Sequence, residues 1–180
     1  GLMYAGVPMP MPVAVSEACF VGDAVAVVVA ESRYAARDAV GTVLVDYEPL
    51  PVVVDLEDAA TDDVLAHTDL TSNTSYVWEL IPDPDAVDRA FAEATHHITE
   101  RYLQQRLIPS AMEPRGVAVV PQPQGGEITI WSATQIPHIL KLMVAATTGT
   151  PEHKVRVIAP SVGGGFGCKL NVYAEEILAV

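Results

Sequence analysis

Four glycines lie within five residues in the stretch VGGGFGCKL, at positions 163–167. KVRVIAP before it is typical of a short strand, and KLNVYAEEILAV at its end has apolar residues at helical spacing. Glycine is favoured where a chain takes left-handed backbone or approaches another group closely. A strand, a glycine loop and a helix can also surround an anion with N–H groups. The stretch therefore predicts a loop that approaches a large polar ligand, with a simple reversal of the chain as the alternative.

Two well-known phosphate-binding patterns do not fit this loop. The dinucleotide pattern Gly-x-Gly-x-x-Gly, begun at Gly163 and Gly165, requires a glycine where Cys168 stands. The Walker pattern requires a Ser or Thr hydroxyl for magnesium after the lysine, and Leu170 has none. Nucleotide hydrolysis is therefore disfavoured, and a nucleotide-binding domain ranks only third among the hypotheses.

The composition indicates a folded protein with an acidic surface. Of the 180 residues, 50% are hydrophobic and 18% are charged, and the formal net charge is −13. Because this charge repels nucleic acid, we expect no nucleic-acid partner. No apolar run reaches the roughly 18 residues that a membrane span needs. Cys19 and Cys168 are far apart and form no CxxC pair, which favours reduced thiols, a cytoplasmic location and no protein-ligated metal.

Apolar patterning in the first half predicts one small α/β unit followed by a polar crossing. A strand over 23–31, a helix over 33–40 that Ser32 caps, and a second strand over 42–55 make up the unit. The acidic, polar residues that follow are typical of an inter-domain segment. A helix over 86–94 is expected next, with Asp85 as its cap.

The second half predicts a sheet with one well-marked helix. Strands are expected over 95–107 and 115–121, and Gly125-Gly126 begins a hairpin arm that runs to Thr134. The segment 134–149 has an apolar stripe, a proline in its first turn and a closing glycine, as helices do. A last short strand, KVRVIAP, leads into the glycine loop.

Three motifs resemble, in order, those of the molybdopterin-binding large subunit of molybdenum hydroxylases. They are MEPRG (112–116), TQIPH (134–138) and GGGFGCK (163–169). These enzymes form the xanthine dehydrogenase and aldehyde oxidase superfamily. Residues 20–55 are similar to the a/b hammerhead domain that precedes the molybdenum domain in that family. Within that family, the sequence most resembles large subunits of the carbon monoxide dehydrogenase type. The resemblance covers nearly the whole chain and implies that the chain is a fragment of a larger oxidoreductase subunit.

The fold implied by the resemblance is α+β (mixed α/β), in two parts. Residues 1–58 would be the C-terminal portion of an a/b hammerhead-like domain, and residues 85–180 the N-terminal part of the molybdopterin-binding domain. Residues 59–84 would link the two.

The resemblance implies a set of cofactor-binding residues: Gln135, Gly164, Gly165, Phe166 and Gly167. Gln135 matches the family glutamine that hydrogen-bonds an oxo ligand of the molybdenum, a role that suits an amide because it donates without adding charge. The N–H groups of Phe166 and Gly167 are expected to face the dithiolene and oxo groups, and Phe166 also shapes the substrate side.

No catalytic residue is implied within this chain, because the family's catalytic glutamate lies farther downstream. Glu113 and Arg115 are expected to form a buried ion pair that is structural or lines the substrate channel. No protein ligand to a metal is expected, since the pterin's sulfurs hold the molybdenum. Cys168 stands where glycine is commoner in the family, which leaves open how closely that position approaches the cofactor.

The implied activity is oxidation of a small substrate, such as carbon monoxide, an aldehyde or a purine, with oxygen derived from water. The implied cofactor is molybdopterin, as the cytosine dinucleotide, with molybdenum. Electrons would pass to Fe–S clusters and FAD on partners, namely a 2Fe–2S small subunit and an FAD-binding medium subunit. The 180 residues alone, without the remainder of the large subunit, are expected to be inactive. The alternative hypothesis is a non-catalytic interaction module derived from this family.

Overall fold

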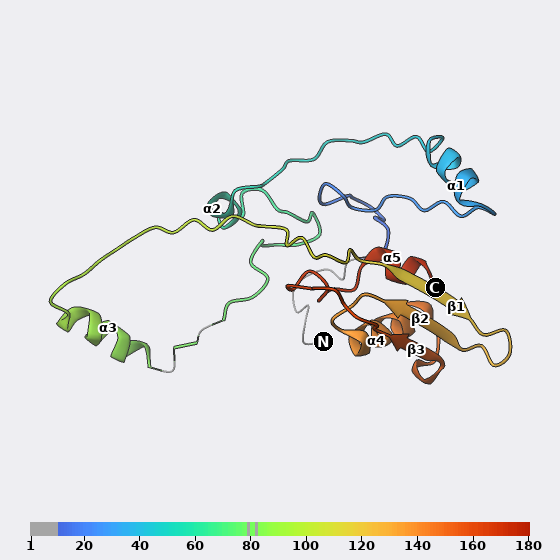
Figure 1. The fold of residues 1–180 in the computed structure, drawn as a ribbon. Helices are drawn as coiled ribbons and strands as arrows, with labels where there is room; N and C mark the ends of the chain where they lie inside the picture. The colour runs from blue at the N-terminus through green and yellow to red at the C-terminus, as the bar shows by residue number, and fades with distance from the viewer. Residues whose placement is uncertain (1–10, 79, 82) are drawn as a thin grey trace. The chain divides into compact units, whose positions relative to one another are not determined.

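The computed structural model describes residues 11–78, 80–81 and 83–180, and its fold is α+β, as predicted (Figure 1). The first ten residues of the predicted hammerhead-like region lie outside the described part. The elements in chain order are α1 (Arg33–Val40), α2 (Leu56–Ala59), α3 (Pro84–Glu93), β1 (Val117–Pro121), β2 (Ile128–Ser132), α4 (Pro137–Thr148), the 3-10 helix η1 (Glu152–Lys154), β3 (Val155–Ile158) and α5 (Ala174–Leu178).

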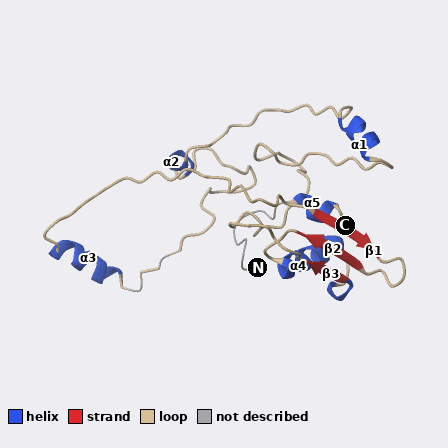
Figure 2. Ribbon diagram, in the orientation of Figure 1, coloured by secondary structure: helices blue, strands red, loops and turns tan. Residues whose placement is uncertain are grey.

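The chain packs as two units. Of the described residues, one unit consists of residues 49–78, 80–81 and 83–106 and contains α2 and α3. The other consists of residues 11–48 and 107–180 and contains the sheet together with α1, α4 and α5 (Figure 2). In the described residues of both units, no helix is long and apolar enough to cross a membrane.

The three strands form one mixed sheet in the order β1-β2-β3, with β1 antiparallel and β3 parallel to β2. The predicted hairpin between β1 and β2 is confirmed, and both glycines of its turn have positive φ. Since side chains alternate along a strand, the register aligns Val119, Ile130 and Val157 across one face of the sheet. That face carries the apolar core.

Helix α4 covers the apolar face and completes the core. Its Leu140 and Val144 are buried together with Ile130 of β2 and Val155 of β3. A proline occupies the first turn, where its missing N–H costs nothing, and Gly149 ends the helix at φ +72°. The predicted helix over 134–149 is therefore confirmed, apart from its first three residues.

The amino-terminal helix also forms as its sequence predicts. In α1 the hydroxyl of Ser32 accepts a hydrogen bond from the backbone N–H of Ala35 at 3.1 Å, and Gly41 ends the helix. The strands predicted over 23–31, 42–55 and 95–107 were wrong, because these segments have no sheet pairing among the described residues. A strand is stable only when a neighbouring strand satisfies its backbone groups along its length. In the described chain these segments have only isolated backbone contacts, such as the hydrogen bond from the N–H of Ala14 to the carbonyl of Ala24 at 2.7 Å.

In the unit that contains α2, Asn73 organises the loop after that helix. Its amide nitrogen donates to the carbonyls of Ala59 and Val64, both at 2.8 Å, and its amide oxygen accepts from the N–H of Ala66 at 2.7 Å. Its backbone N–H donates to the carboxylate of Asp62 at 2.6 Å, which lowers the pKa of Asp62. One side chain thus holds a polar segment that lacks an apolar core of its own.

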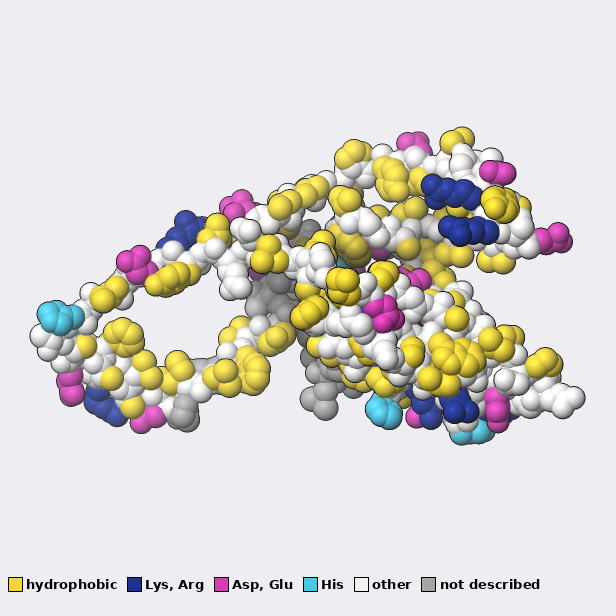
Figure 3. Space-filling model, in the orientation of Figure 1, with side chains coloured by type: hydrophobic (Ala, Val, Ile, Leu, Met, Phe, Trp, Pro, Cys, Tyr) yellow, Lys and Arg dark blue, Asp and Glu magenta, His cyan; other side chains and the backbone are white. Residues whose placement is uncertain are grey.

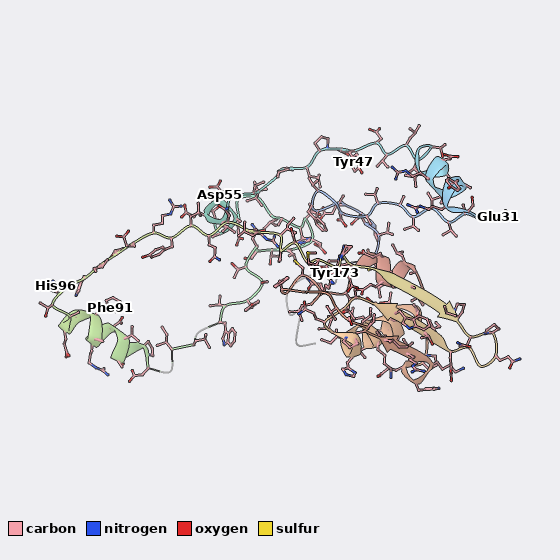
Figure 4. The ribbon with its side chains drawn as sticks, in the orientation of Figure 1. Glu31, Tyr47, Asp55, Phe91, His96 and Tyr173 are labelled. Atoms are coloured by element: carbon pink, nitrogen blue, oxygen red, sulfur yellow. The ribbon has the colours of Figure 1, made fainter. Side chains whose placement is uncertain are left out.

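Helix α3 begins earlier than the sequence indicated. Asp83, and not Asp85, is the cap: its carboxylate accepts from the N–H of Ala86 at 2.9 Å. The reason is Pro84, whose preset φ suits the first helical position and so moves the start of the helix towards the amino terminus. At the other end of α3, the ring of Phe91 (labelled in Figure 4) meets the ring of His97 edge to face, with 6.3 Å between the ring centroids.

The packing of the core predicts different stability effects for two leucines on α4. Leu140 is fully buried and Leu142 is 54% exposed. Leu140→Ala should lower the free energy of unfolding by about 2–5 kcal/mol, because it removes buried methyl groups and leaves a cavity. The control Leu142→Ala should change it by less than about 0.5 kcal/mol. Denaturant unfolding of the two variants measures both values, and equal losses would contradict the core described above.

Candidate functional site

Three chain segments meet at one edge of the sheet. Because β2 and β3 are parallel, the segments that follow them, 133–136 and 159–170, leave from the same edge. β1 is antiparallel to β2, and the pairing of Val117 with Ser132 places its start at that edge too. Ligands commonly bind outside the carboxyl ends of parallel strands. The three motifs singled out from the sequence therefore lie where such a fold places a site.

The glycine loop uses the backbone freedom of its glycines. Gly163, Gly164 and Gly167 have φ of +59°, +95° and +87°, values that other residues rarely adopt. Phe166 has φ of +49°, which is uncommon for a bulky residue, and the residue is 74% exposed. Strained residues of this kind cluster at functional sites. The loop therefore presents an aromatic ring and open backbone at the surface.

The N–H groups of the loop are available to a ligand. Within the described chain, no N–H from Gly163 to Gly167 donates to a protein acceptor. Cys168 differs, since its N–H donates to the carbonyl of Gly165 at 2.8 Å and its carbonyl accepts from the hydroxyl of Tyr173 (labelled in Figure 4). The run of free donors therefore ends before Cys168.

Gly165 and Gln135 are in direct contact. A methyl group on Gly165 would overlap the Cδ and Oε1 atoms of Gln135 and would lie 2.9 Å from its Cγ. The same Oε1 accepts a hydrogen bond from the backbone N–H of Lys169 at 3.2 Å. The other end of the amide, the Nε2 group, donates to no described residue. Gln135 thus has an anchored oxygen and two free N–H donors.

Glu113 contacts the start of the loop in the same way. A methyl group on Gly163 would overlap the Cβ and Oε2 atoms of Glu113. The backbone N–H of Glu113 donates to the carbonyl of Gly163 at 3.2 Å. Two glycines of the loop therefore leave room for side chains from the two neighbouring segments, and this explains why residues with a Cβ do not fit there.

The predicted ion pair between Glu113 and Arg115 was wrong. The guanidinium of Arg115 contacts the carboxylate of Glu175 at 2.8 Å and lies 3.4 Å over the ring of Tyr173. Both partners are partly exposed. The backbone contact with Gly163 holds Glu113 against the loop, so its neighbour two residues on reaches α5 instead.

Two buried charged residues were missed by reasoning from the sequence. Lys169 is 3% exposed, and its ammonium donates to the backbone carbonyls of Glu113, at 2.9 Å, and Val162. Glu176 is 6% exposed and accepts from the hydroxyl of Ser132. The available signal was position: Lys169 directly follows the loop, and Glu176 lies within an otherwise apolar helical stripe.

A family model described as the molybdopterin cofactor-binding domain matches residues 66–180 of this chain. Among similar proteins is the carbon monoxide dehydrogenase large chain of Afipia carboxidovorans, 37% identical over 174 residues, which cover 89% of this chain and 21% of that protein. Another is the 6-hydroxypseudooxynicotine dehydrogenase complex subunit gamma of Paenarthrobacter nicotinovorans, 36% identical over 92% of this chain and 20% of that protein. The chain thus spans about a fifth of the length of these relatives.

Solved structures agree with these matches. A reconstituted CO dehydrogenase from Oligotropha carboxidovorans superposes with a TM-score of 0.71 at 35% identity, over 82% of this chain and 20% of that one. Quinoline 2-oxidoreductase from Pseudomonas putida superposes with a TM-score of 0.68 at 32% identity, over 83% of this chain and 19% of that one.

The contact between Gly165 and Gln135 can be tested without any ligand. Gly165→Ala should displace the Gln135 amide and free the N–H of Lys169, which should then exchange with deuterium at least about tenfold faster, since a broken hydrogen bond opens the group to solvent. Gly116→Ala is the control, because its added methyl group would meet nothing within 4 Å. Unchanged exchange at Lys169 in Gly165→Ala would contradict the contact.

Proposed function

The chain belongs to the molybdopterin cofactor-binding domain family, and from that premise we propose that it forms part of the large subunit of a molybdenum-dependent hydroxylase or dehydrogenase. The observation that carries the proposal is the meeting of Gln135 and the loop 163–167 at the carboxyl ends of β2 and β3. The names of the relatives, which include dehydrogenases of carbon monoxide and of a nicotine-derived compound, support an oxidoreductase.

We assign the cofactor-binding role to Gln135, Gly164, Gly165, Phe166 and Gly167. The loop fits a large anionic group because its consecutive N–H groups donate to no described protein acceptor and can point to a bound anion. Gly165 carries no Cβ, which keeps the Gln135 amide in place beside the loop. The exposed Phe166 ring would border the substrate.

Gln135 would act as a neutral hydrogen-bond donor. Its oxygen is held by the N–H of Lys169, so its Nε2 group is the end that can donate to an oxygen ligand of the metal. An amide donates without adding charge, so it can stabilise developing negative charge on an oxygen without pairing as an ion.

When bound, the molybdopterin group, as the cytosine dinucleotide, would supply the redox chemistry, in which oxygen from water enters a small substrate. The chain's own residues contribute binding and orientation. The catalytic glutamate expected from the family lies outside the residues of this chain, and the loop and Gln135 form one wall of the site.

We further propose the domain division and the partners that the family implies. Residues 1–58 would be the C-terminal portion of an a/b hammerhead-like domain, residues 59–84 a linker, and residues 85–180 the start of the cofactor domain. An FAD-binding medium subunit, a 2Fe–2S small subunit and the remainder of the large subunit would be its partners. Many large apolar side chains are exposed, such as Trp78 at 73% and Leu103 at 81%, which supports cover by further polypeptide (Figure 3).

Elemental analysis of the full-length protein, purified with its partner subunits, tests the proposal. We expect stoichiometric molybdenum, together with turnover of carbon monoxide, an aldehyde or an N-heterocycle in the presence of an artificial electron acceptor. A folded complex without molybdenum and without turnover would refute the enzyme and favour a non-catalytic interaction module.

The role of Gln135 predicts a loss of rate without a loss of cofactor. In the full-length enzyme, Gln135→Ala should keep its molybdenum and lower kcat by about 10²–10³-fold, the usual effect of removing one donor to developing charge. Gln122→Ala is the control, because Gln122 lies beyond the end of β1 and is exposed. Equal kcat values in the two variants would remove Gln135 from the site.

The 180 residues by themselves should have no activity. One wall of the site is present, and positioning by a single wall does not hold a substrate against the cofactor. Steady-state assays of the isolated chain with the same substrates and acceptor check this. Turnover faster than the background reaction without protein would contradict it.

A further inference from the structure

Lys169 is buried in a way that needs an explanation. Its side chain is almost wholly removed from solvent, and among the described residues it forms no ion pair with a carboxylate. A buried ammonium is costly unless hydrogen bonds satisfy it. Here the ammonium donates to two backbone carbonyls, that of Glu113 at 2.9 Å and that of Val162. A methionine would fill the same space, so packing alone does not account for a lysine.

The contacts of Lys169 reach every segment of the site. Its ammonium joins the start of the glycine loop, at Val162, to the segment before β1, at Glu113. Its backbone N–H donates to the side-chain oxygen of Gln135 at 3.2 Å, and its carbonyl accepts from the backbone N–H of Gln135 at 2.9 Å. The hydroxyl of Thr134 donates to that carbonyl at 3.5 Å. One residue thus touches all three motifs.

The backbone and the side chain of Lys169 together fix the position of the Gln135 amide. The backbone of Lys169 sets which end of the Gln135 amide faces outward, because an N–H requires the amide oxygen opposite it. The side chain of Lys169 sets where that backbone lies, since the ammonium holds the loop against the neighbouring segment. A displacement of the loop would therefore displace the amide donors of Gln135.

We propose that Lys169 is a positioning residue, whose buried ammonium holds the glycine loop so that the Gln135 amide presents its N–H donors to the bound cofactor. This inference rests on the function proposed above. Lys169 itself touches neither substrate nor cofactor; it acts through Gln135 and through the loop.

The test uses the full-length holoenzyme with its partner subunits. Lys169→Met removes the two hydrogen bonds while keeping the apolar stem. Lys141→Met makes the same change at a partly exposed lysine whose partner, Glu152, is 3.7 Å away on the surface. Lys169→Gln restores a neutral donor that is one atom shorter. Molybdenum content, kcat, KM and the electron paramagnetic resonance spectrum of the molybdenum(V) state are measured for each variant.

We expect Lys169→Met to lower kcat per bound molybdenum by about tenfold or more, because a misplacement of about 1 Å can cost about a hundredfold in rate. KM should change little, and the molybdenum(V) spectrum should shift, because the donors near the metal have moved. Lys169→Gln should be intermediate, and Lys141→Met should match the wild type. A purely structural lysine would alter the yield of folded protein and leave the spectrum of the bound metal unchanged.

The outcomes separate this inference from the proposed function. A wild-type complex without molybdenum overturns both. With molybdenum in the wild type, an unchanged spectrum and kcat in Lys169→Met overturn the inference alone. If Lys169→Met binds no molybdenum, Lys169→Gln decides: recovered molybdenum with an intermediate kcat supports the positioning role, and no recovery assigns Lys169 to folding and overturns it.

Discussion

β2 and β3 pair in parallel, with Ile130 opposite Val157, and the segments that follow them therefore begin side by side at one edge of the sheet. Helix α4 makes this pairing possible, because it crosses from the end of β2 back to the start of β3 and buries Leu140 on the sheet. Gln135 follows the first of these strands and the glycine loop follows the second. If the core under α4 were lost, nothing would hold Gln135 next to the glycine loop.

Within that frame, the site is assembled by close approach. The side chain of Glu113 lies where a Cβ of residue 163 would be, and the amide of Gln135 lies where a Cβ of residue 165 would be. Because both loop residues are glycines, the three segments can pack in direct contact. The price is backbone conformations that need glycine, and Phe166 takes one of them without being a glycine. Lys169 then joins the same segments by hydrogen bonds from a buried position. Steric room and polar contacts thus act on the same few residues.

Local signals predicted much of this fold. The cap at Ser32, the glycines of the hairpin and the closing Gly149 each act within a few residues, and each element they mark is present. The segments 23–31 and 42–55 have the apolar, β-branched composition of strands, yet among the described residues they are unpaired. Composition measures the tendency to be extended, whereas a strand also requires a partner that no local pattern supplies.

For the candidate site, the sequence by itself determined the features on which the proposed cofactor site rests: a loop that tolerates left-handed backbone, an amide at Gln135 and an aromatic ring at Phe166. Their spacing and type are local properties that can be read along the chain. Only the tertiary structure decided that Arg115 pairs with Glu175 and that Lys169 lies buried beneath the loop. Those contacts join residues up to 60 positions apart, and they depend on where the sheet and its connections bring the backbone, which no neighbouring residue specifies.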